Sequence, residues 1–263
     1  MLDINNAEKH FKEYLKNFDT EKEKNKLKIV HTYGVVKASE YIAKDLNLSE
    51  EDIDLAKLIA LLHDIGRFKQ IKIFDNFIDN MENNDYADYG VKILFEENLI
   101  RKFIENDKYD DIIYKAIFNH NKYKIEDGLN EKELLHAKLV RDADKTDNFR
   151  VKEIEKFEAI FDTEVTEEVL EKQTISENIY NDFMNSKVIL RADRKTHMDM
   201  WVSYIAFIFD YNFTSGLKYL YENDYINRLV NRVDYKNVDT KQKMENIRQH
   251  AIKYIEDRLR MEV

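Results

Sequence analysis

The stretch LIALLHDIGRF, Leu58 to Phe68, decides how the rest of the chain is interpreted. A run of five apolar residues, suited to burial, leads directly into His63 and Asp64. Burying an unpaired carboxylate costs several kcal/mol or forces it to take up a proton, so this pair needs a partner. A metal ion would satisfy both side chains at once, and its remaining ligands must then come from elsewhere in the chain.

The composition favours an all-α fold. The 263 residues include no proline and only 5 glycines, whereas average usage is about 5% and 7%. Proline and glycine are common in the turns of sheets and in long loops, so their scarcity indicates helices. A chain of this length can bury a large core, either as one domain or as a core with an extension.

Charge and cysteine content narrow the classes of partner and cofactor. There are no cysteines, so any metal must be held by His, Asp or Glu. The net charge is −10, from 42 basic and 52 acidic residues, and no basic stripe of the kind that binds long nucleic acid is present. Neither a secretion signal nor an apolar run of ~18 residues is found, so we expect a cytoplasmic protein without a membrane partner.

Hydrophobic periodicity predicts helices along the whole chain. The sequence predicts an irregular connector over 74–90 that leads into a helix, and the segment MWVSYIAFIF, 200–209, is expected to pack in a core. Further helical segments fill the rest of 151–263. In the first half of the chain, helices are expected at about 1–22, 26–46, 49–66, 86–97 and 109–120, and from residue 130 onwards.

Capping patterns set several helix ends. Ser49 is followed three residues later by Asp52, and Asn130 by Glu133, so each pair is expected to open a helix. Gly66 is expected to close the helix that contains His63, because glycine is the preferred residue just past a helix end.

Four residues stand out as candidate metal ligands: His31, His63, Asp64 and Asp144. Each lies on or at the end of a predicted helix with apolar neighbours, and Gly34 allows another helix to approach His31 closely. Two imidazoles and two carboxylates form a mixed nitrogen–oxygen set. Such a set suits Mn²⁺, Fe²⁺, Co²⁺ or Mg²⁺ with open coordination positions better than a closed structural zinc site.

The order His31, His63–Asp64, Asp144 resembles the H…HD…D signature of the HD superfamily of metal-dependent phosphohydrolases. LLHDIGRF resembles the HDIG form of that motif, and LVRDADKTDNFR, 139–150, resembles its closing aspartate segment. The resemblance covers about 26–150 and implies helices around a divalent metal held by these four residues. It also implies hydrolysis of phosphate esters or anhydrides, often in nucleotides.

The last ligand has a rival within the same segment. Asp142 also lies in the RDADK sequence, but Asp144 matches the "AD" step of the family pattern and shares a helix face with Val140. We therefore expect Asp144 to be the ligand and keep Asp142 as the alternative.

Two further residues are suggested by the resemblance. His120, in AIFNHNKY, matches a position where many relatives carry a histidine that protonates the leaving group, contacts phosphate or binds a second metal. Tyr86, in DYADYG, stands where relatives with two metals have a histidine. A neutral phenol is a poor ligand, so we expect one tightly held metal. Tyr86 would instead donate a hydrogen bond to phosphate.

The cations nearest these motifs are Arg67, Arg141 and Lys145. Opposite a metal, Arg67 and Lys145 are expected to bind the substrate phosphates, arginine in a bidentate manner. His120 and Asp64 are the residues expected to take part in catalysis.

The resulting prediction is an all-α protein with an HD-domain core and a C-terminal helical extension. Residues 1–150 would form the core with its N-terminal helix, and 151–263 the extension packed on it. The expected activity is metal-dependent hydrolysis of a small phosphorylated substrate, most readily a nucleotide, with Mn²⁺ or Fe²⁺ favoured over Mg²⁺, Co²⁺ or Ni²⁺. The alternatives are a ligand-binding or regulatory module with a degenerate HD site and a single-strand nuclease; a homo-oligomer is compatible with the sequence.

Overall fold

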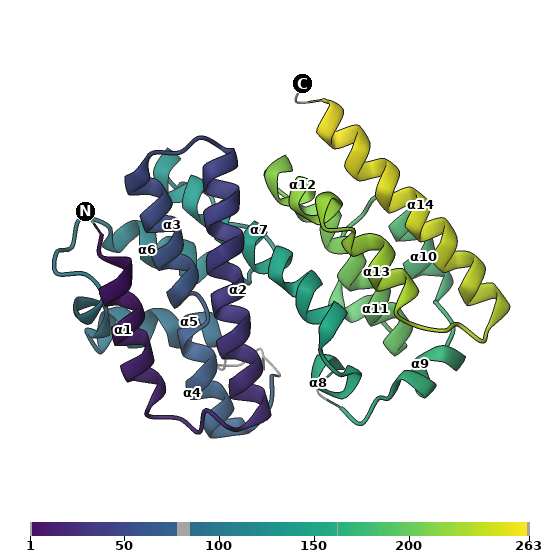
Figure 1. Ribbon diagram of the computed structural model, residues 1–263, viewed down its shortest axis with the longest axis horizontal. Coiled ribbons are helices and arrows are strands. Elements are labelled where there is room, and N and C mark those ends of the chain that lie inside the picture. Colours follow the sequence, from purple (N-terminus) through teal and green to yellow (C-terminus); the bar gives the residue numbers. More distant parts are fainter. Residues whose placement is uncertain (1, 78–84, 162, 262–263) are drawn as a thin grey trace. The chain divides into compact units, whose positions relative to one another are not determined.

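The computed structural model describes residues 2–77, 85–161 and 163–261. Within these ranges every regular element is a helix, which confirms the all-α prediction. The chain divides into two compact units, Met1–Asp147 and Asn148–Val263, and the helix α7 (Glu131–Ile154) runs through the boundary (Figure 1). Packing of residues 151–263 on the core stays a prediction.

The first unit consists of helices and helical turns joined by short connections. One of them, η1, is a π-helical turn that follows α5 directly, and η2 is a 3₁₀ turn. Besides the first part of α7, the elements are α1 (Ile4–Leu15), α2 (Glu23–Asp45), α3 (Glu50–Leu62), α4 (Ile65–Phe74), α5 (Tyr86–Val91), η1 (Lys92–Glu96), η2 (Leu99–Lys102) and α6 (Asp110–Asn119).

Both predicted capping patterns are present. Ser49 Oγ accepts a hydrogen bond from the Asp52 backbone N–H at 3.2 Å and so opens α3. At the start of α7, Asn130 Oδ1 accepts from the Glu133 N–H at 3.0 Å, and the Glu133 carboxylate accepts from the Asn130 N–H at 2.9 Å. These bonds satisfy backbone N–H groups that a helix leaves without partners in its first turn.

The prediction that Gly66 closes a helix is wrong. The helix α3 ends at Leu62, and α4 begins at Ile65, so Gly66 lies inside α4. A Cβ at Gly66 would lie 2.2 Å from Tyr86 O and 2.4 Å from Gly90 N, so this glycine allows α4 and α5 to cross closely. The connector expected over 74–90 is also partly wrong, since Phe74 belongs to α4. Its residues 78–84 lie outside the described residues.

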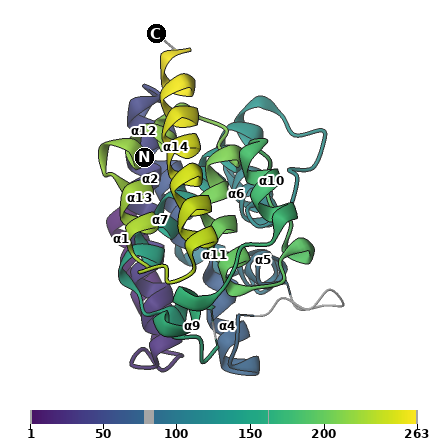
Figure 2. The same ribbon diagram turned by 90° about the vertical axis from the view of Figure 1, so that its right-hand side faces the viewer.

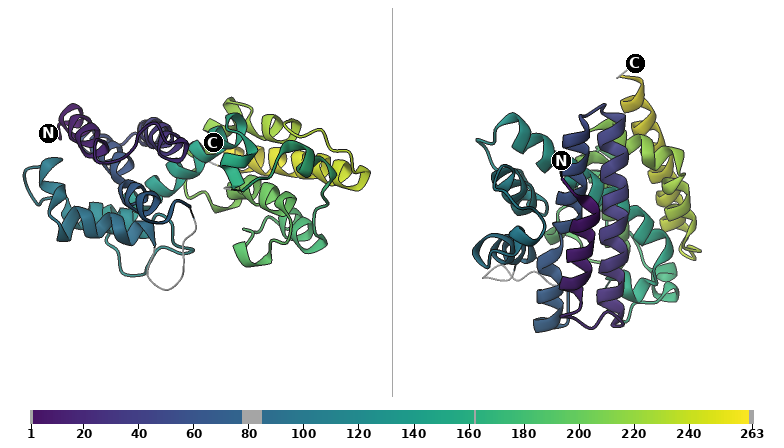
Figure 3. Two further views of the ribbon diagram at one scale, coloured as in Figure 1. Left: turned by 90° about the horizontal axis from the view of Figure 1, so that it is seen from below. Right: turned by 60° about the vertical axis from the view of Figure 1, so that its left-hand side comes forward.

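The core of the first unit holds the bend between α3 and α4 in place. The helices α1 and α2 both pack against α3, while α5 packs against α4 and α6 (Figure 3). All five apolar residues of Leu58–Leu62 are at most 1% exposed. Since each large apolar side chain contributes about 1.5–3 kcal/mol when fully buried, this segment fixes the position of the two residues that follow it.

The second unit has its own core. The long α14 lies alongside α10, α12 and α13 (Figure 2). Trp201, Val202 and Ile205 are completely buried, which confirms that the segment 200–209 packs in a core. After α7 the elements are α8 (Phe157–Phe161), α9 (Glu167–Lys172), α10 (Glu177–Met184), η3 (Arg191–Asp193), α11 (His197–Ile205), η4 (Ala206–Asp210), α12 (Thr214–Glu222), α13 (Tyr225–Asn231) and α14 (Val238–Arg260).

In the part of the chain that the structure describes, none of the helices combines the length and the apolar character needed to cross a membrane.

Candidate metal centre

Four buried or half-buried side chains from separate helices meet in the first unit. His31 comes from α2, His63 and Asp64 from the bend between α3 and α4, and Asp144 from α7. Asp64 Oδ2 lies 3.8 Å from His31 Nε2 and 3.6 Å from His63 Nε2. Asp144 Oδ1 lies 3.0 Å from His31 Nε2. The structure therefore brings all four predicted ligands together.

The two imidazoles are oriented by their Nδ1 atoms. His31 Nδ1 lies 2.7 Å from Asp147 Oδ2, and His63 Nδ1 lies 2.7 Å from Ala60 O. A carboxylate or carbonyl oxygen can only accept, so these partners assign the proton of each neutral ring to Nδ1. Each Nε2 is then left with a lone pair that faces Asp64, which is the arrangement a metal-binding histidine needs.

The donor atoms fit a divalent metal ion. His63 Nε2 and Asp64 Oδ1 are buried and have no hydrogen-bond partner among the described residues; His31 Nε2 likewise makes no hydrogen bond of good geometry. Leaving such groups unsatisfied costs about 1–3 kcal/mol each. One ligand atom from each of these three residues lies within 4.8 Å of the other two. These three residues are therefore close enough to be candidate ligands of one metal ion, which nitrogen and oxygen donors of this kind bind.

The pKa shifts of Asp64, Asp144 and His63 favour the protonation states that bind a cation. Burial alone would raise the pKa of Asp64, but Lys28, whose Nζ lies 2.7 Å from Asp64 Oδ2, and the neighbouring histidines hold it well below its usual range. Burial likewise opposes the ionised form of Asp144, and His31 outweighs it, so the Asp144 pKa is also lowered. The pKa of His63 is lowered, mainly by burial. Ionised carboxylates and a neutral imidazole are the states that bind metal.

His31 has the opposite shift. Burial and the charge of Lys28 disfavour its protonated form, but the carboxylates of Asp144 and Asp147 outweigh both and raise its pKa. Without a metal, His31 is thus held between two anions. A metal ion at Nε2 would replace the proton as the positive charge between them.

The geometry favours Asp144 over Asp142 as the last ligand. Asp144 is the one whose carboxylate reaches His31. Residues two apart on a helix lie about 200° apart around its axis, so the side chains of Asp142 and Asp144 point in different directions. The role of Asp144 as a ligand stays a prediction.

His120 and Tyr86 form a pair beside the cluster. His120 Nδ1 lies 2.6 Å from Ile117 O and therefore donates to it. Nε2, 3.1 Å from the Tyr86 hydroxyl oxygen, then accepts a hydrogen bond from that hydroxyl. The His120 ring lies 5.3 Å from that of His63, edge to face. Burial, followed by the charge of His63, lowers the pKa of His120 to about 4. In this arrangement the proton of the pair resides on Tyr86.

Arg67 lies next to this pair. Its guanidinium stacks on the Tyr86 ring, with Cζ 3.2 Å from the ring centroid, and it donates to Gln70 Oε1. Its charge also contributes to the lowered pKa of Asp64. Stacking and the hydrogen bond hold the cation beside the cluster, where a phosphate group would need it.

The other two cations of these motifs are placed differently. Lys145 is buried on α7, directly after Asp144. Arg141 donates to Asn119 O at 2.9 Å and to Lys122 O, so it fixes the end of α6 and the chain beyond it. Arg141 therefore holds the segment around His120 through the backbone.

Two residues that matter to the centre were not predicted from the sequence: Lys28 and Asp147. Each lies three positions from a predicted ligand on the same helix, Lys28 before His31 and Asp147 after Asp144, and residues so spaced share a helix face. That spacing is the signal that could have identified them. Gly34 confirms the predicted close approach: a Cβ there would lie 1.9 Å from Asp147 Oδ1.

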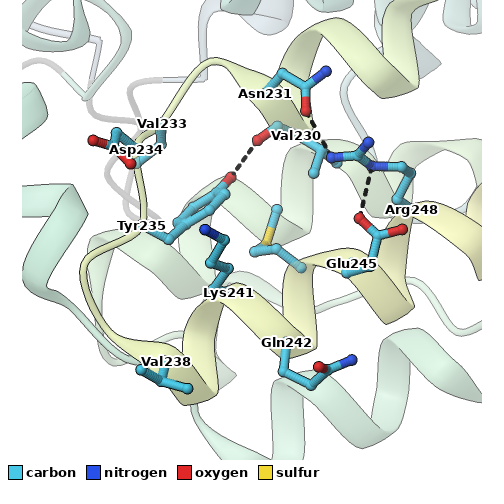
Figure 4. A pocket seen from close by; sticks show the side chains of 11 residues that line it. Val230, Asn231, Val233, Asp234, Tyr235, Val238, Lys241, Gln242, Glu245 and Arg248 are labelled. Atoms are coloured by element: carbon cyan, nitrogen blue, oxygen red, sulfur yellow. Dashed lines mark hydrogen bonds and ion pairs between the residues drawn. The ribbon is translucent and has the colours of Figure 1, made fainter.

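A pocket lies elsewhere, in the second unit (Figure 4). It has a volume of about 500 Å³ and is lined only by residues between 230 and 248. Arg248 is fixed at one end, with Asn231 Oδ1 2.6 Å from one nitrogen and Glu245 3.3 Å from another. None of the predicted site residues lines this pocket, so it is separate from the metal centre.

Comparisons with known proteins support the interpretation of the first unit. Searches of curated proteins and of solved structures gave no match. Residues 29–148, however, match the family model of the HD domain. The matched range contains all four predicted ligands, together with Tyr86 and His120. The segment formed by residues 29–148 is therefore an HD domain.

Proposed function

We propose that the HD segment holds one divalent metal ion and hydrolyses a phosphate ester or anhydride bond of a small phosphorylated substrate, with nucleotides as the first candidates. HD domains are commonly hydrolases of this type. The observation that carries the proposal is the convergence of His31, His63 and Asp64, buried and with metal-binding atoms that lack partners. A structural cluster without a metal would leave these atoms unsatisfied.

A bound metal would lower the pKa of a coordinated water towards ~7 and would polarise a phosphoryl oxygen. The protein supplies the charge that binds the substrate. Lys28 and Arg67 are the cations that contact Asp64 or act on its charge. They would bind the phosphate oxygens that do not bind the metal, arginine through two parallel N–H groups. Lys145 is a third candidate for this role.

The pair of His120 and Tyr86 would act on the leaving group. In its neutral form His120 accepts a hydrogen bond from the Tyr86 hydroxyl at Nε2, because its Nδ1–H is donated to Ile117 O. A substrate oxygen that reaches the pair would accept the hydrogen bond of the Tyr86 hydroxyl in place of His120, and Nε2 of the neutral His120 ring would then be free to take up a proton. General acid–base assistance of this kind contributes about 10²–10⁴-fold to a rate.

The same pair supports a centre with one metal. His120 Nε2 is already occupied by the Tyr86 hydroxyl at 3.1 Å, and Arg67 covers the Tyr86 ring. A second ion at His120 would have to displace the hydroxyl and lie next to the guanidinium charge. Repulsion between the two cations opposes that arrangement.

The test is a phosphate-release screen on protein stripped of metal and reloaded separately with Mn²⁺, Fe²⁺, Co²⁺, Ni²⁺ or Mg²⁺. Substrates would include nucleoside mono-, di- and triphosphates and sugar phosphates. We expect activity on at least one substrate and its loss in Asp64→Ala. The control is Asp127→Ala, which removes an exposed carboxylate whose ion-pair partner among the described residues is Lys124.

Binding of a nucleotide by the reloaded protein, without turnover of any substrate, would overturn this proposal. The chain would then be a ligand-binding module, in which the Tyr86–His120 pair has replaced a reactive group. Cleavage of single-stranded nucleic acid in preference to mononucleotides would instead identify a nuclease.

A further inference from the structure

A group of hydrogen-bond donors in the second unit has no negatively charged partner among the described residues. It comprises Arg191 and Arg194, on and just after the 3₁₀ turn η3, and the hydroxyl of Tyr204 on α11. All three lie beyond the segment that matches the HD domain. Neither the metal centre nor the pocket of Figure 4 includes any of them.

Arg194 is half-buried and has only neutral partners. Its Nε lies 3.3 Å from Arg191 O, and its Nη1 lies 3.1 Å from Ser203 Oγ. A guanidinium has five N–H donors, and these bonds use two of them. Residues 2–77, 85–161 and 163–261 provide no carboxylate within ion-pair distance of Arg194.

Arg232, another half-buried arginine of this unit, has the kind of negatively polarised partner that Arg194 lacks. It donates to Lys152 O and Glu155 O at the C-terminal end of α7, where the helix dipole is negative. Burial lowers the pKa of both arginines, but nearby glutamates oppose the shift at Arg232. At Arg194 only Tyr204 opposes it, and Arg191 lowers the pKa further.

The groups around Arg194 add donors rather than acceptors. The Arg191 side chain is exposed and makes no hydrogen bond or ion pair with a described residue, and the same part of the chain offers no partner to the Tyr204 hydroxyl. Both guanidinium charges act on Tyr204, although burial dominates and raises its pKa. Lys152 Nζ brings a further positive charge, 4.5 Å from the centroid of the Tyr204 ring.

Two oxygen-bearing side chains close to the arginines in sequence or space, Ser203 and Asp193, do not neutralise this positive charge. Ser203 Oγ already donates to Met200 O at 2.7 Å, which turns its lone pairs towards Arg194 but adds no negative charge. Asp193 lies between the arginines in the sequence, yet it is exposed and forms no ion pair with either among the described residues. Arg191, Arg194 and Tyr204 thus contribute N–H and O–H donors and two positive charges that act on one another.

We propose that Arg191, Arg194 and Tyr204 form a binding site for a phosphate group in the second unit. A phosphate carries up to two negative charges and several acceptor oxygens, which matches two guanidiniums and a phenol that all donate. Arginine binds such an oxyanion through parallel N–H groups. The source of the group is inorganic phosphate or the phosphate of a small phosphorylated molecule.

The test measures binding of inorganic phosphate to the full chain by calorimetry in the presence of EDTA. We expect saturable binding to wild type and to Asp64→Ala, because the site does not depend on the metal centre. Arg194→Gln should weaken binding at least about tenfold, since hydrogen bonds to charged groups are lost. Arg191→Gln should weaken it about two- to fivefold; its side chain is exposed, so this variant keeps the test valid if Arg194→Gln fails to fold.

The matched control is Arg258→Gln on α14. Arg258 donates to the hydroxyl of Tyr254 at 3.0 Å, and its loss changes the net charge by the same amount without touching the proposed site. Wild-type affinity is expected for this variant.

Adenosine monophosphate and acetate identify the ligand chemistry. Tighter binding of the nucleotide than of inorganic phosphate, with the same dependence on Arg194, would assign the site to a phosphorylated molecule; equal affinity would assign it to free phosphate. Acetate that binds as tightly as phosphate would contradict the phosphate assignment. Absence of saturable phosphate binding to wild type, or wild-type affinity in both Arg194→Gln and Arg191→Gln, would overturn the proposal. None of these results depends on whether the HD segment is a hydrolase.

Discussion

At the scale of single residues, Asp147 controls the direction in which His31 presents its metal-binding nitrogen. The Asp147 carboxylate accepts from His31 Nδ1 at 2.7 Å, and Gly34 leaves the space that the carboxylate occupies. Partners of this kind fix the tautomer of a ligand and raise its basicity. The candidate metal centre therefore includes a carboxylate that contacts a predicted ligand and is not itself one of the four.

Asp147→Ala is expected to lower the affinity for Mn²⁺ by about 10–100-fold, the usual effect of losing such a partner. The measurement is a titration of the metal-free protein with Mn²⁺. Asp127→Ala, at an exposed ion pair, should bind the ion as wild type does. An unchanged affinity in Asp147→Ala would show that His31 does not need this carboxylate for metal binding.

His120 and Tyr86 are expected to affect turnover and to leave metal binding intact. His120→Gln should lower kcat by about 10²–10⁴-fold, and Tyr86→Phe by about tenfold, since it loses one hydrogen bond near the reacting group. Steady-state kinetics and metal content would be measured on the same samples. Loss of the metal in His120→Gln would contradict the assignment, because it would make His120 a ligand.

The residues of the signature motif could be identified from the sequence. Residues outside the motif, such as Lys28 and Asp147, were missed. His31, His63, Asp64 and Asp144 meet in the structure because the order of the motif reflects a shared fold. Lys28 contacts Asp64 across 36 positions of sequence, so only the folded arrangement shows that pair.

At the scale of elements, the crossing of α4 and α5 positions Tyr86 against Arg67 and His120. Gly66 and Gly90 face each other there, but their tolerance differs. A Cβ at Gly66 would clash with backbone at 2.2 Å, whereas a Cβ at Gly90 would have its nearest neighbour at 3.6 Å, an ordinary contact. The crossing therefore requires one of the two glycines.

Gly66→Ala is expected to lower the free energy of unfolding by about 1–3 kcal/mol, the usual effect of overpacking. Gly90→Ala should be neutral or slightly stabilising, because alanine favours helix. Denaturant unfolding of both variants provides the comparison. Equal stability of the two would show that α4 and α5 can separate at no cost.

Asp52 joins the start of α3 to α7. Burial would raise its pKa, but hydrogen bonds from Ser49, Lys132 and His136 lower it from 3.8 to about 2. A lowered carboxyl pKa stabilises the fold above the unfolded value, and that contribution is lost as the pH falls from about 4 towards 2. The shift corresponds to roughly 2 kcal/mol at neutral pH.

Asp52→Asn should therefore be less stable than wild type by roughly 2 kcal/mol at pH 7, and the difference should shrink as the pH approaches 2. Urea unfolding at pH 7, 4 and 3 would measure it. A difference that stays constant across this range would show that ionisation of Asp52 does not contribute to stability.

Helix starts were predictable from local patterns, and the bend at the centre was not. Ser49 and Asn130 cap helices because their side chains bond to backbone only three residues away. The role of Gly66 depends on Tyr86 and Gly90, which approach it only in the folded chain. A glycine required by a distant helix looks the same in a sequence as a glycine that ends its own helix.

At the scale of the whole molecule, the net charge favours a hydrolase of small substrates over a nuclease. The net charge of −10 disfavours binding to a phosphate backbone, since such binding requires many cations and weakens steeply with salt. We expect a single-stranded oligonucleotide neither to be cleaved nor to inhibit the activity on mononucleotides. Fluorescence anisotropy of a labelled oligonucleotide at 50 and 200 mM salt would measure binding; tight binding that falls steeply with salt would contradict this expectation.

The division into two units also sets what the sequence could predict about function. The motif covers 29–148, and beyond it the sequence predicted only helices and a core around 200–209. The donors of Arg191, Arg194 and Tyr204 come from separate elements, and no local spacing marks them as a group. That the described residues offer them no negatively charged partner is seen only in the folded chain.

Metal stoichiometry tests most directly whether His31, His63, Asp64 and Asp144 form a centre for one ion. The metal-free protein would be equilibrated with Mn²⁺ and the bound metal determined by elemental analysis, in wild type, His63→Ala and Asp64→Ala. We predict about one ion per chain in wild type and none in either variant, as expected when ligands of a single site are removed. Two ions in wild type, no ion in wild type, or an ion retained in either His63→Ala or Asp64→Ala would contradict the proposed centre.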